Sequence, residues 1–322
     1  MKKFIITIDT EGDNQWDWKP GKKITTNNTD YLKRFQSLCD KYSYKPVWLS
    51  NYEMIQDDNY VKFIKDVVES GRGEIGMHLH AWSTPPHYDL PIEKNGAPYL
   101  IEFPYDVMEQ KISVMTDFII NRTGIKPVSH RAGRWATNQD YFNLLIKYGY
   151  LVDCSVTPHI DWSSNFGQTS KSKGSDYSNA PIKPYFINST NDNKSIFEVP
   201  VTIMRSHSIA GSNDSSSVKR LAKNLINSVR GRNLWIRPNG NNLEDMLRVV
   251  FNNINNDLDY IMFMIHSSEL MPGGSPSFKN TDSIDKLYDD LNILFNEISK
   301  NYSGITLDDY RKEYNRCQKS TV

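Results

Sequence analysis

The sequence predicts an α/β fold built on a mainly parallel β-sheet. Along the 322 residues, short apolar runs alternate with longer segments of helical periodicity, which is the pattern of parallel βα units. Ionisable residues recur where the apolar runs end: Asp9, Glu11, His78, His80, Arg131, Asp153 and His266. Because functional groups of such folds gather at the carboxyl ends of the strands, these side chains are expected to meet at one edge of the sheet.

The first predicted strand is the apolar run 4–8, and it is followed by three alternating carboxylates, Asp9, Glu11 and Asp13. Residues two apart in a strand share a face, so the three acids could converge at the strand end. Like charges at that spacing are costly unless a cation or a shared proton relieves them. We therefore expect a metal or acid/base site here, the alternative being a turn with solvated acids.

The N-terminal half continues with alternating helices and strands. Helices are expected over 30–42, 60–70, 107–122 and 139–148, where apolar residues recur at helical spacing and several segments stop at a glycine. Strands are expected over 46–49, 74–80, 127–131 and 150–155. His130 is expected on the opposite strand face from Arg131, as a structural residue. The Pro-rich segment 84–104 is too long and irregular for an ordinary connection and is expected to be an insertion.

The C-terminal half follows the same alternation. A second insertion is expected over 157–193, which is rich in Ser, Asn, Lys and Pro. Strands are expected over 196–204, 234–237, 260–266 and 304–307, and helices over 215–229, 243–255 and 284–298. The charged tail 308–322 is expected to be a frayed end. We expect a single domain over residues 1–322 with the two insertions.

Composition excludes several classes of protein. Lysine plus arginine equals aspartate plus glutamate, 38 each, whereas a nucleic-acid binder should show a basic excess. Three cysteines that lie far apart suggest neither a disulfide framework nor a zinc cluster, and favour a reducing compartment. The first apolar run is too short for a signal peptide and no run reaches a membrane span, so we expect a soluble cytoplasmic protein.

The histidines at the strand ends suit metal chemistry. Imidazole nitrogens and carboxylate oxygens bind Zn²⁺, and three protein ligands leave a position open for water. The ion lowers the pKa of that water and polarises a carbonyl, while a second carboxylate and another histidine can move protons. A single buried histidine is more often a hydrogen-bonded core residue. The acids at the first strand end favour a ligand role for His78.

The order of these segments, from Phe4 to about Leu270, resembles the polysaccharide deacetylase family, carbohydrate esterase family 4, with its NodB homology domain. Residues 7–11, Thr-Ile-Asp-Thr-Glu, are similar to a spaced variant of its first motif. Residues 74–78, Glu-Ile-Gly-Met-His, are similar to the residues that lead into its second motif, including the first histidine of that motif. The resemblance implies a distorted (β/α)7-type barrel with irregular insertions, Asp9 as general base, and Glu11 and His78 as metal ligands.

The second motif departs from the family pattern. The family's second histidine would fall at Trp82, which we instead expect to contact the substrate. His80, on the same strand face as His78, is the expected replacement ligand, and His87 is held in reserve. Zinc is the expected ion.

Three further segments resemble the later motifs of the family. Arg131 would hold and orient Asp9, with Trp135 forming a wall of the site. Asp153, at a strand end, is similar to the aspartate of the fourth motif and is expected to take part in catalysis. His266 would be the general acid, with Met264 lining a pocket for the acyl methyl group.

The function implied by this resemblance is that of a metal-dependent hydrolase that removes an acetyl group from an N-acetylated sugar. The expected substrate is a soluble, nucleotide-linked or lipid-linked precursor in surface polysaccharide biosynthesis. Arg134 and Arg237 could bind a phosphate or a sugar acid, the alternative being ordinary ion pairs. Two other functions remain open: a non-sugar amidase similar to the allantoinase-like branch, and a carbohydrate-binding protein without catalysis.

Overall fold

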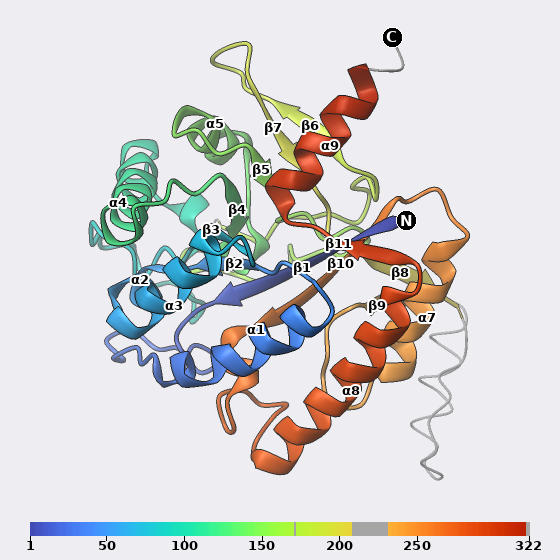
Figure 1. The fold of residues 1–322 in the computed structure, drawn as a ribbon. Helices are drawn as coiled ribbons and strands as arrows, with labels where there is room; N and C mark the ends of the chain where they lie inside the picture. Colours follow the sequence, from blue (N-terminus) through green and yellow to red (C-terminus); the bar gives the residue numbers. More distant parts are fainter. Residues whose placement is uncertain (171, 208–230, 320–322) are drawn as a thin grey trace.

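The computed structural model describes residues 1–170, 172–207 and 231–319. A curled sheet of nine strands forms its centre, and a separate two-stranded sheet lies beside it (Figure 1). The strands are β1 (Lys2–Thr10), β2 (Val47–Ser50), β3 (Glu74–Leu79), β4 (Ser129–Ala132), β5 (Val152–Asp153), β6 (Tyr185–Asn188), β7 (Ser195–Glu198), β8 (Ile203–Ser206), β9 (Arg232–Trp235), β10 (Tyr260–His266) and β11 (Tyr302–Gly304).

The main sheet runs in the order β10-β1-β2-β3-β4-β5-β7-β6, and β11 also pairs with β1. Every pairing in it is parallel except that of β6 with β7. Among the described strands the sheet curls without closing, which makes it a parallel half-barrel. The predicted fold class, a distorted (β/α) barrel, is therefore confirmed.

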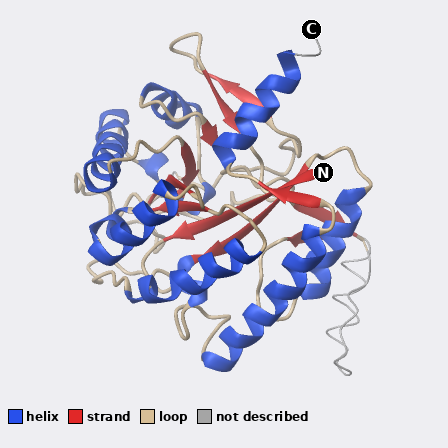
Figure 2. Ribbon diagram, in the orientation of Figure 1, coloured by secondary structure: helices blue, strands red, loops and turns tan. Residues whose placement is uncertain are grey.

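Helices cover the outside of the curled sheet (Figure 2). In the part that the structure describes, no helix has the length and apolar character needed to cross a membrane. The α-helices are α1 (Leu32–Lys41), α2 (Tyr52–Gln56), α3 (Asp58–Glu69), α4 (Tyr105–Thr123), α5 (Gln139–Lys147), α7 (Leu243–Ile254), α8 (Thr281–Ser299) and α9 (Leu307–Lys319). Short 3-10 helices are η1 (Asn27–Tyr31), η2 (Leu100–Glu102), η3 (Gly133–Trp135) and η4 (Ser267–Leu270).

Strand β1 is buried on both faces, which explains its uninterrupted apolar run. Phe4, Ile6 and Ile8 pack in the main core together with residues of α1 and α8. Ile5 points to the other face and joins a second cluster that includes Val152 of β5. With both faces of the strand occupied by packing, its carboxyl end is the place where polar side chains emerge.

In the C-terminal half, the segments 157–193 and 196–204 differ from the predictions, as does the strand expected over 304–307, which is observed as β11, Tyr302–Gly304. The expected insertion 157–193 contains β6, which extends the sheet as an antiparallel edge strand beside β7. The expected strand 196–204 is two strands, β7 and β8, separated by residues that include Pro200. Proline has no N–H for a ladder, so a continuous strand is interrupted there. The helix expected over 215–229 lies outside the described residues, and the single-domain assignment stays a prediction.

The described part of the tail, residues 308–319, is helical, which corrects the prediction of a frayed end there. Helix α9 covers Leu307–Lys319, and Leu307 and Tyr310 are buried. The Tyr314 ring lies 4.8 Å from that of Phe197 in β7, measured between centroids. The helix therefore belongs to the second core cluster, although most of its residues are charged or polar.

Candidate metal and catalytic site

The carboxyl ends of β1, β3 and β10 meet at one cavity of about 410 Å³. Asp9 lies opposite His266 across the β1–β10 pairing. His78 lies opposite Arg131 across the β3–β4 pairing. The predicted residues that line this cavity are Asp9, Glu11, His78, His80, Trp82, Arg134, Trp135 and His266. Parallel strands thus bring together side chains that are far apart in the sequence.

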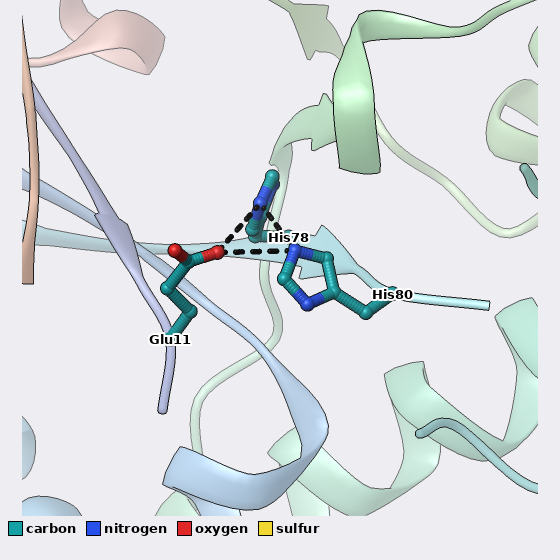
Figure 3. A group of neighbouring side chains, drawn as sticks. All are labelled: Glu11, His78 and His80. Carbon is teal, nitrogen blue, oxygen red and sulfur yellow. Dashed lines mark hydrogen bonds and ion pairs between the residues drawn. The ribbon is translucent and has the colours of Figure 1, made fainter. Parts of the chain in front are cut away.

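Glu11, His78 and His80 form a compact group (Figure 3), with one potential ligand atom of each within 4.8 Å of the others. The Glu11 Oε2 atom lies 3.2 Å from His80 Nε2 and 3.8 Å from His78 Nε2. The two Nε2 atoms lie 2.9 Å apart. All three side chains are buried. Two imidazoles and one carboxylate are a donor set that zinc accepts, with room for a further ligand.

The surroundings of His78 favour the neutral, metal-binding form of its ring. Its Nδ1 lies 3.0 Å from the backbone oxygen of Arg131, which accepts a hydrogen bond and fixes the tautomer. The lone pair of Nε2 is then directed toward Glu11 and His80. Burial lowers the pKa of His78 to about 4, so the ring stays neutral near pH 7. The residues therefore fit a divalent metal ion.

The backbone of Glu11 is held in place by the neighbouring strand end. Ser267, the first residue of η4, accepts a hydrogen bond from Glu11 N at 3.0 Å and donates one to Glu11 O at 2.9 Å. Asn28 also donates to Glu11 O. Asp13, the third acid of the opening segment, instead accepts a hydrogen bond from Asn27 N at 2.6 Å and stabilises the following loop.

Asp9 forms a buried ion pair with Arg131, which is the partner that the family resemblance implies. Arg131 Nη1 donates to Asp9 Oδ1 at 2.6 Å, and Nη2 donates to Thr7 Oγ1 at 2.9 Å. Burial by itself raises the pKa of Asp9, but the charge of Arg131, followed by those of His78 and His266, outweighs burial. The net pKa lies well below that of an ordinary aspartate, so Asp9 is ionised.

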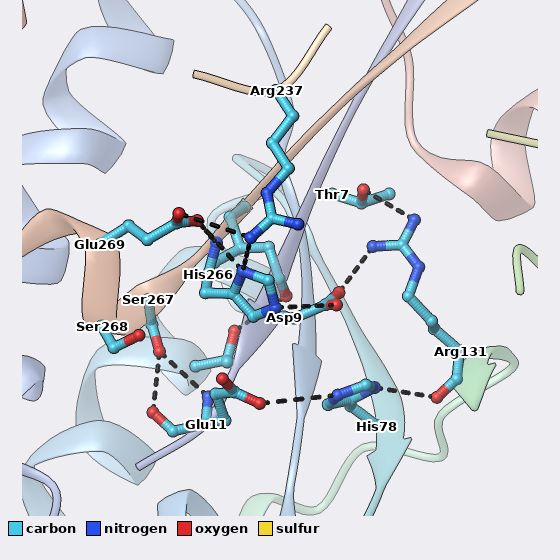
Figure 4. Close-up of polar contacts among 12 residues, drawn as sticks. Thr7, Asp9, Glu11, His78, Arg131, Arg237, His266, Ser267, Ser268 and Glu269 are labelled. Carbon is cyan, nitrogen blue, oxygen red and sulfur yellow. Dashed lines mark hydrogen bonds and ion pairs between the residues drawn. The ribbon is translucent and has the colours of Figure 1, made fainter. Parts of the chain in front are cut away.

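His266 faces Asp9 on one side and Glu269 on the other (Figure 4). Its Nε2 lies 3.8 Å from Asp9 Oδ2, and its Nδ1 lies 3.0 Å from Glu269 Oε2. Burial and the charge of Arg237 lower the pKa of His266, but Glu11 and Glu269 outweigh them and raise it above the usual value. The imidazole is therefore suited to hold a proton that it can donate.

Tryptophan side chains form the walls of the cavity. Trp82 stacks on His80 with ring centroids 4.2 Å apart, and Trp18 lies 5.5 Å from Trp82. Trp16 approaches His266 edge to face at 5.0 Å, and Trp135 lies over the Arg131 guanidinium at 5.0 Å. Such large amphipathic rings offer apolar faces beside polar groups, which is what the C–H faces of a sugar ring require.

Four predicted candidates are not in the cavity lining: Arg131, which contacts Asp9, and Asp153, Met264 and His87. Asp153 is buried away from it, because its carboxylate contacts His130 Nδ1 at 2.6 Å and accepts from Ser155. Met264 lies two residues before His266 in β10, is fully buried and is not among the residues that line the cavity. His87 is exposed and lies outside the metal group.

Sequence reasoning missed Glu269, Glu53 and Trp16. Glu269 follows His266 by three residues, and the two form a capping box at the start of η4. That spacing was the available signal, because a polar residue followed three positions later by Glu often marks a helix start. Arg237, only a weak candidate in the sequence, lies with its Nη2 atom 3.1 Å from His266 Nδ1.

Comparisons with known proteins find similar solved structures. No family model and no curated protein matches the chain. A Mycobacterium smegmatis protein assigned as a polysaccharide deacetylase matches with a TM-score of 0.56 at 14% identity, over 99% of this chain and 92% of that one. A Parabacteroides distasonis protein assigned as a glycoside hydrolase/deacetylase matches with a TM-score of 0.61 at 10% identity, over 98% and 72%.

The same architecture occurs in a longer enzyme. The 4-alpha-glucanotransferase from Thermococcus litoralis matches with a TM-score of 0.52 at 12% identity, over 97% of this chain. The chain spans 40% of the length of that enzyme. At such identities the likeness concerns the fold. The chain therefore has the fold of the polysaccharide deacetylases, which is the fold implied by the resemblance of its motifs.

Proposed function

We propose that this protein is a metal-dependent carbohydrate deacetylase, which hydrolyses the acetamide of an N-acetylated sugar. The observation that carries the proposal is the placement of Asp9 and His266 beside the group Glu11, His78 and His80, in one tryptophan-walled cavity. The fold shared with polysaccharide deacetylases supports it. Zinc is the ion that the donor set favours.

The metal would be held by Glu11, His78 and His80. When bound, such an ion supplies Lewis acidity toward a water molecule and an acyl carbonyl. Asp9 accepts the proton of the attacking water, because its low pKa keeps the carboxylate ionised. Arg131 holds that carboxylate by its Oδ1 atom, which leaves Oδ2 directed toward His266.

His266 donates a proton to the departing amine. Glu269 contacts Nδ1, so that Nε2 faces Asp9 and the reaction centre. The raised pKa keeps the imidazolium populated near neutral pH. Trp16, Trp82 and Trp135 bind the faces of the sugar and exclude water from the acetamide.

The first test replaces the proposed base. Asp9→Asn keeps the shape of the side chain but removes the proton acceptor, so acetate release from N-acetylated oligosaccharides should fall by roughly 10²- to 10⁴-fold. Metal content, measured by mass spectrometry of the purified protein, should stay the same because Asp9 is not in the metal group. Unchanged acetate release would contradict the role of Asp9.

Metal analysis also tests the alternative of carbohydrate binding without catalysis. A protein of that kind has no need of the ion and should purify without a stoichiometric metal. A panel of ureides and other non-sugar amides, compared with N-acetylhexosamines, tests the allantoinase-like amidase. The tryptophan walls favour the sugar.

A further inference from the structure

A second cavity, of about 470 Å³, adjoins the proposed catalytic cavity. Trp16 and Arg237 line both cavities and so form their common border. Its other lining residues include the amides Asn233, Asn239 and Asn242 and the indole of Trp235. An aromatic wall combined with amides is suited to a further sugar unit. The second cavity therefore offers room for a sugar unit beyond Arg237.

Arg237 has hydrogen-bonding capacity left over at this border. Only its Nη2 atom is engaged: it donates to Glu269 Oε1 at 3.5 Å and lies 3.1 Å from His266 Nδ1, which can accept a hydrogen bond only while that nitrogen carries no proton. Nε and Nη1 have no partner among the described residues, and the side chain is 28% exposed. A guanidinium has five N–H groups in a fixed fork, so one edge of it remains open to a ligand.

Arg134, the other described arginine that lines the catalytic cavity, is used differently. Its Nη1 donates to the backbone oxygen of Ala97, and its Nη2 donates to that of Phe166 at 3.0 Å. The guanidinium also lies over the Tyr99 ring at 4.1 Å. Arg134 therefore joins loops, whereas Arg237 presents free donors to the cavities.

The charges around Arg237 favour an anion. Asp9 is already paired with Arg131. The carboxylate of Glu269 is shared between His266 and Arg237. Glu269 is thus the carboxylate that contacts both Arg237 and His266, so the open edge of the Arg237 guanidinium faces no carboxylate of its own among the described residues. Trp16 supports the arrangement, since its ring lies 5.7 Å from the guanidinium and its Nε1 donates to Ser268 Oγ.

We propose that Arg237 binds an anionic group of the substrate, a carboxylate or a phosphate carried by the sugar unit next to the acetylated one. The substrate class is then an acidic N-acetylated glycan. The free edge of the guanidinium matches the paired oxygens of either anion, and arginine is the residue best suited to such bidentate recognition. This inference rests on the proposed deacetylase function and names the class of substrate for that site.

Matched substrates test the inference. Acetate release is measured for three N-acetylated disaccharides in which the second unit is neutral, a uronic acid or a sugar phosphate. The quantity compared is the ratio of kcat/KM for each acidic substrate to that for the neutral one. A charge-assisted bond to arginine predicts a ratio of about 10 to 100 in the unaltered protein for the anion that is recognised. In Arg237→Gln the ratio should fall to about 1.

The ratio separates binding from an indirect effect on His266. Any loss of kcat that Arg237→Gln causes through His266 affects the acidic and the neutral substrate equally, so it cancels in the kcat/KM ratio. If Arg237→Gln leaves the ratio unchanged, the proposal is overturned. Arg237→Lys keeps the charge without the fork and should give an intermediate ratio. Arg34→Gln is the control, because Arg34 forms an exposed ion pair with Asp285 and lines neither cavity. Its ratio should stay that of the unaltered protein.

A binding measurement tests the proposed anion site separately from the proposed deacetylase function. Calorimetric titration of Asp9→Asn with the same disaccharides should show tighter binding of the recognised acidic glycan, and adding Arg237→Gln should remove that difference. Acetate release without an Arg237-dependent preference overturns the anion site and leaves the deacetylase function standing. Absence of acetate release from every disaccharide counts against the proposed function, and the titration then decides the anion site alone.

Discussion

At the scale of single residues, His80 and Glu53 each carry a buried polar atom without a hydrogen-bond partner among the described residues. These atoms are His80 Nδ1 and Glu53 Oε2, and the two residues are 3% and 6% exposed. The other carboxylate oxygen of Glu53 accepts from Gln15 at 2.9 Å. Burial raises the pKa of Glu53, and the charge of His80 opposes the rise. A histidine that binds a metal usually donates its second N–H to such a group.

The Glu53 carboxylate is expected to support metal binding through His80. Glu53→Ala should weaken metal binding by about 10- to 100-fold, because the orientation and basicity of His80 depend on an acceptor for Nδ1–H. Competition with a chromophoric chelator measures the affinity. Glu69→Ala, an exposed residue of α3, is the control and should leave the affinity unaltered. An affinity of Glu53→Ala equal to that of the control would show that His80 needs no carboxylate partner.

Glu269 gives a prediction about pH. His266 must be protonated to act as an acid, so activity should fall as pH rises through its raised pKa. Glu269 is one of the groups that raise the pKa. Glu269→Gln removes that charge, and the alkaline limb of the kcat/KM profile should move to lower pH by about one unit. An alkaline limb at the same pH in both proteins would mean that another group sets it.

The candidate site was largely predictable at this scale because its residues sit where apolar runs end. Asp9, Glu11, His78, His80 and His266 were found in that way. Glu269, the partner of His266, was not, although its position three residues after His266 is the spacing of a capping box. Only the structure shows that Asp153 contacts His130 while Glu269 contacts His266. Which side chains meet across strands depends on register, and a strand pattern alone leaves it open.

At the scale of elements, Lys111 of α4 connects the helix to the loop that follows His80. Its Nζ atom donates to the backbone oxygens of Ala81 at 3.0 Å, Thr84 at 2.6 Å and Pro86 at 2.7 Å. An ammonium group has three donors, and all are used. The loop it holds carries Trp82, so the position of one cavity wall depends on a residue that does not itself line the cavity.

Replacing Lys111 should therefore destabilise the protein. Lys111→Met leaves buried carbonyl oxygens without their donor, which should lower the free energy of unfolding by about 2–4 kcal/mol. Urea denaturation measures the change. Lys62→Met, on the exposed face of α3, is the matched control and should change stability by less than about 0.5 kcal/mol. If the two variants are equally stable, the three hydrogen bonds contribute little.

The elements that escaped prediction are those whose stability comes from tertiary contacts. Strand β6 is a short edge strand that exists because β7 lies beside it. In α9, Leu307, Tyr310 and Tyr314 recur at helical spacing, but their signal is weak among charged neighbours. Tyr310 is held by packing in the second core cluster and by its hydroxyl, which donates to Asp259 Oδ1 at 2.7 Å. The local sequence pattern gives little indication of such tertiary contacts.

At the scale of the whole molecule, the metal group connects strands that are not neighbours. Glu11 follows β1, whereas His78 lies in β3 and His80 directly after it, and β2 lies between these two strands. A bound ion would therefore link the N-terminal part of the chain to the third strand across the curled sheet. Unfolding would have to break that link, because the unfolded chain holds no such preformed group.

Metal should consequently raise the melting temperature. At a free metal concentration of 100 times the dissociation constant, the folded state gains about 2.7 kcal/mol. For a chain of 322 residues, this corresponds to a rise of about 4 °C. Thermal unfolding of chelator-treated protein with and without Zn²⁺ measures it. His80→Ala removes one ligand and should lose most of the rise, so an equal rise in this variant would place the stabilising ion elsewhere.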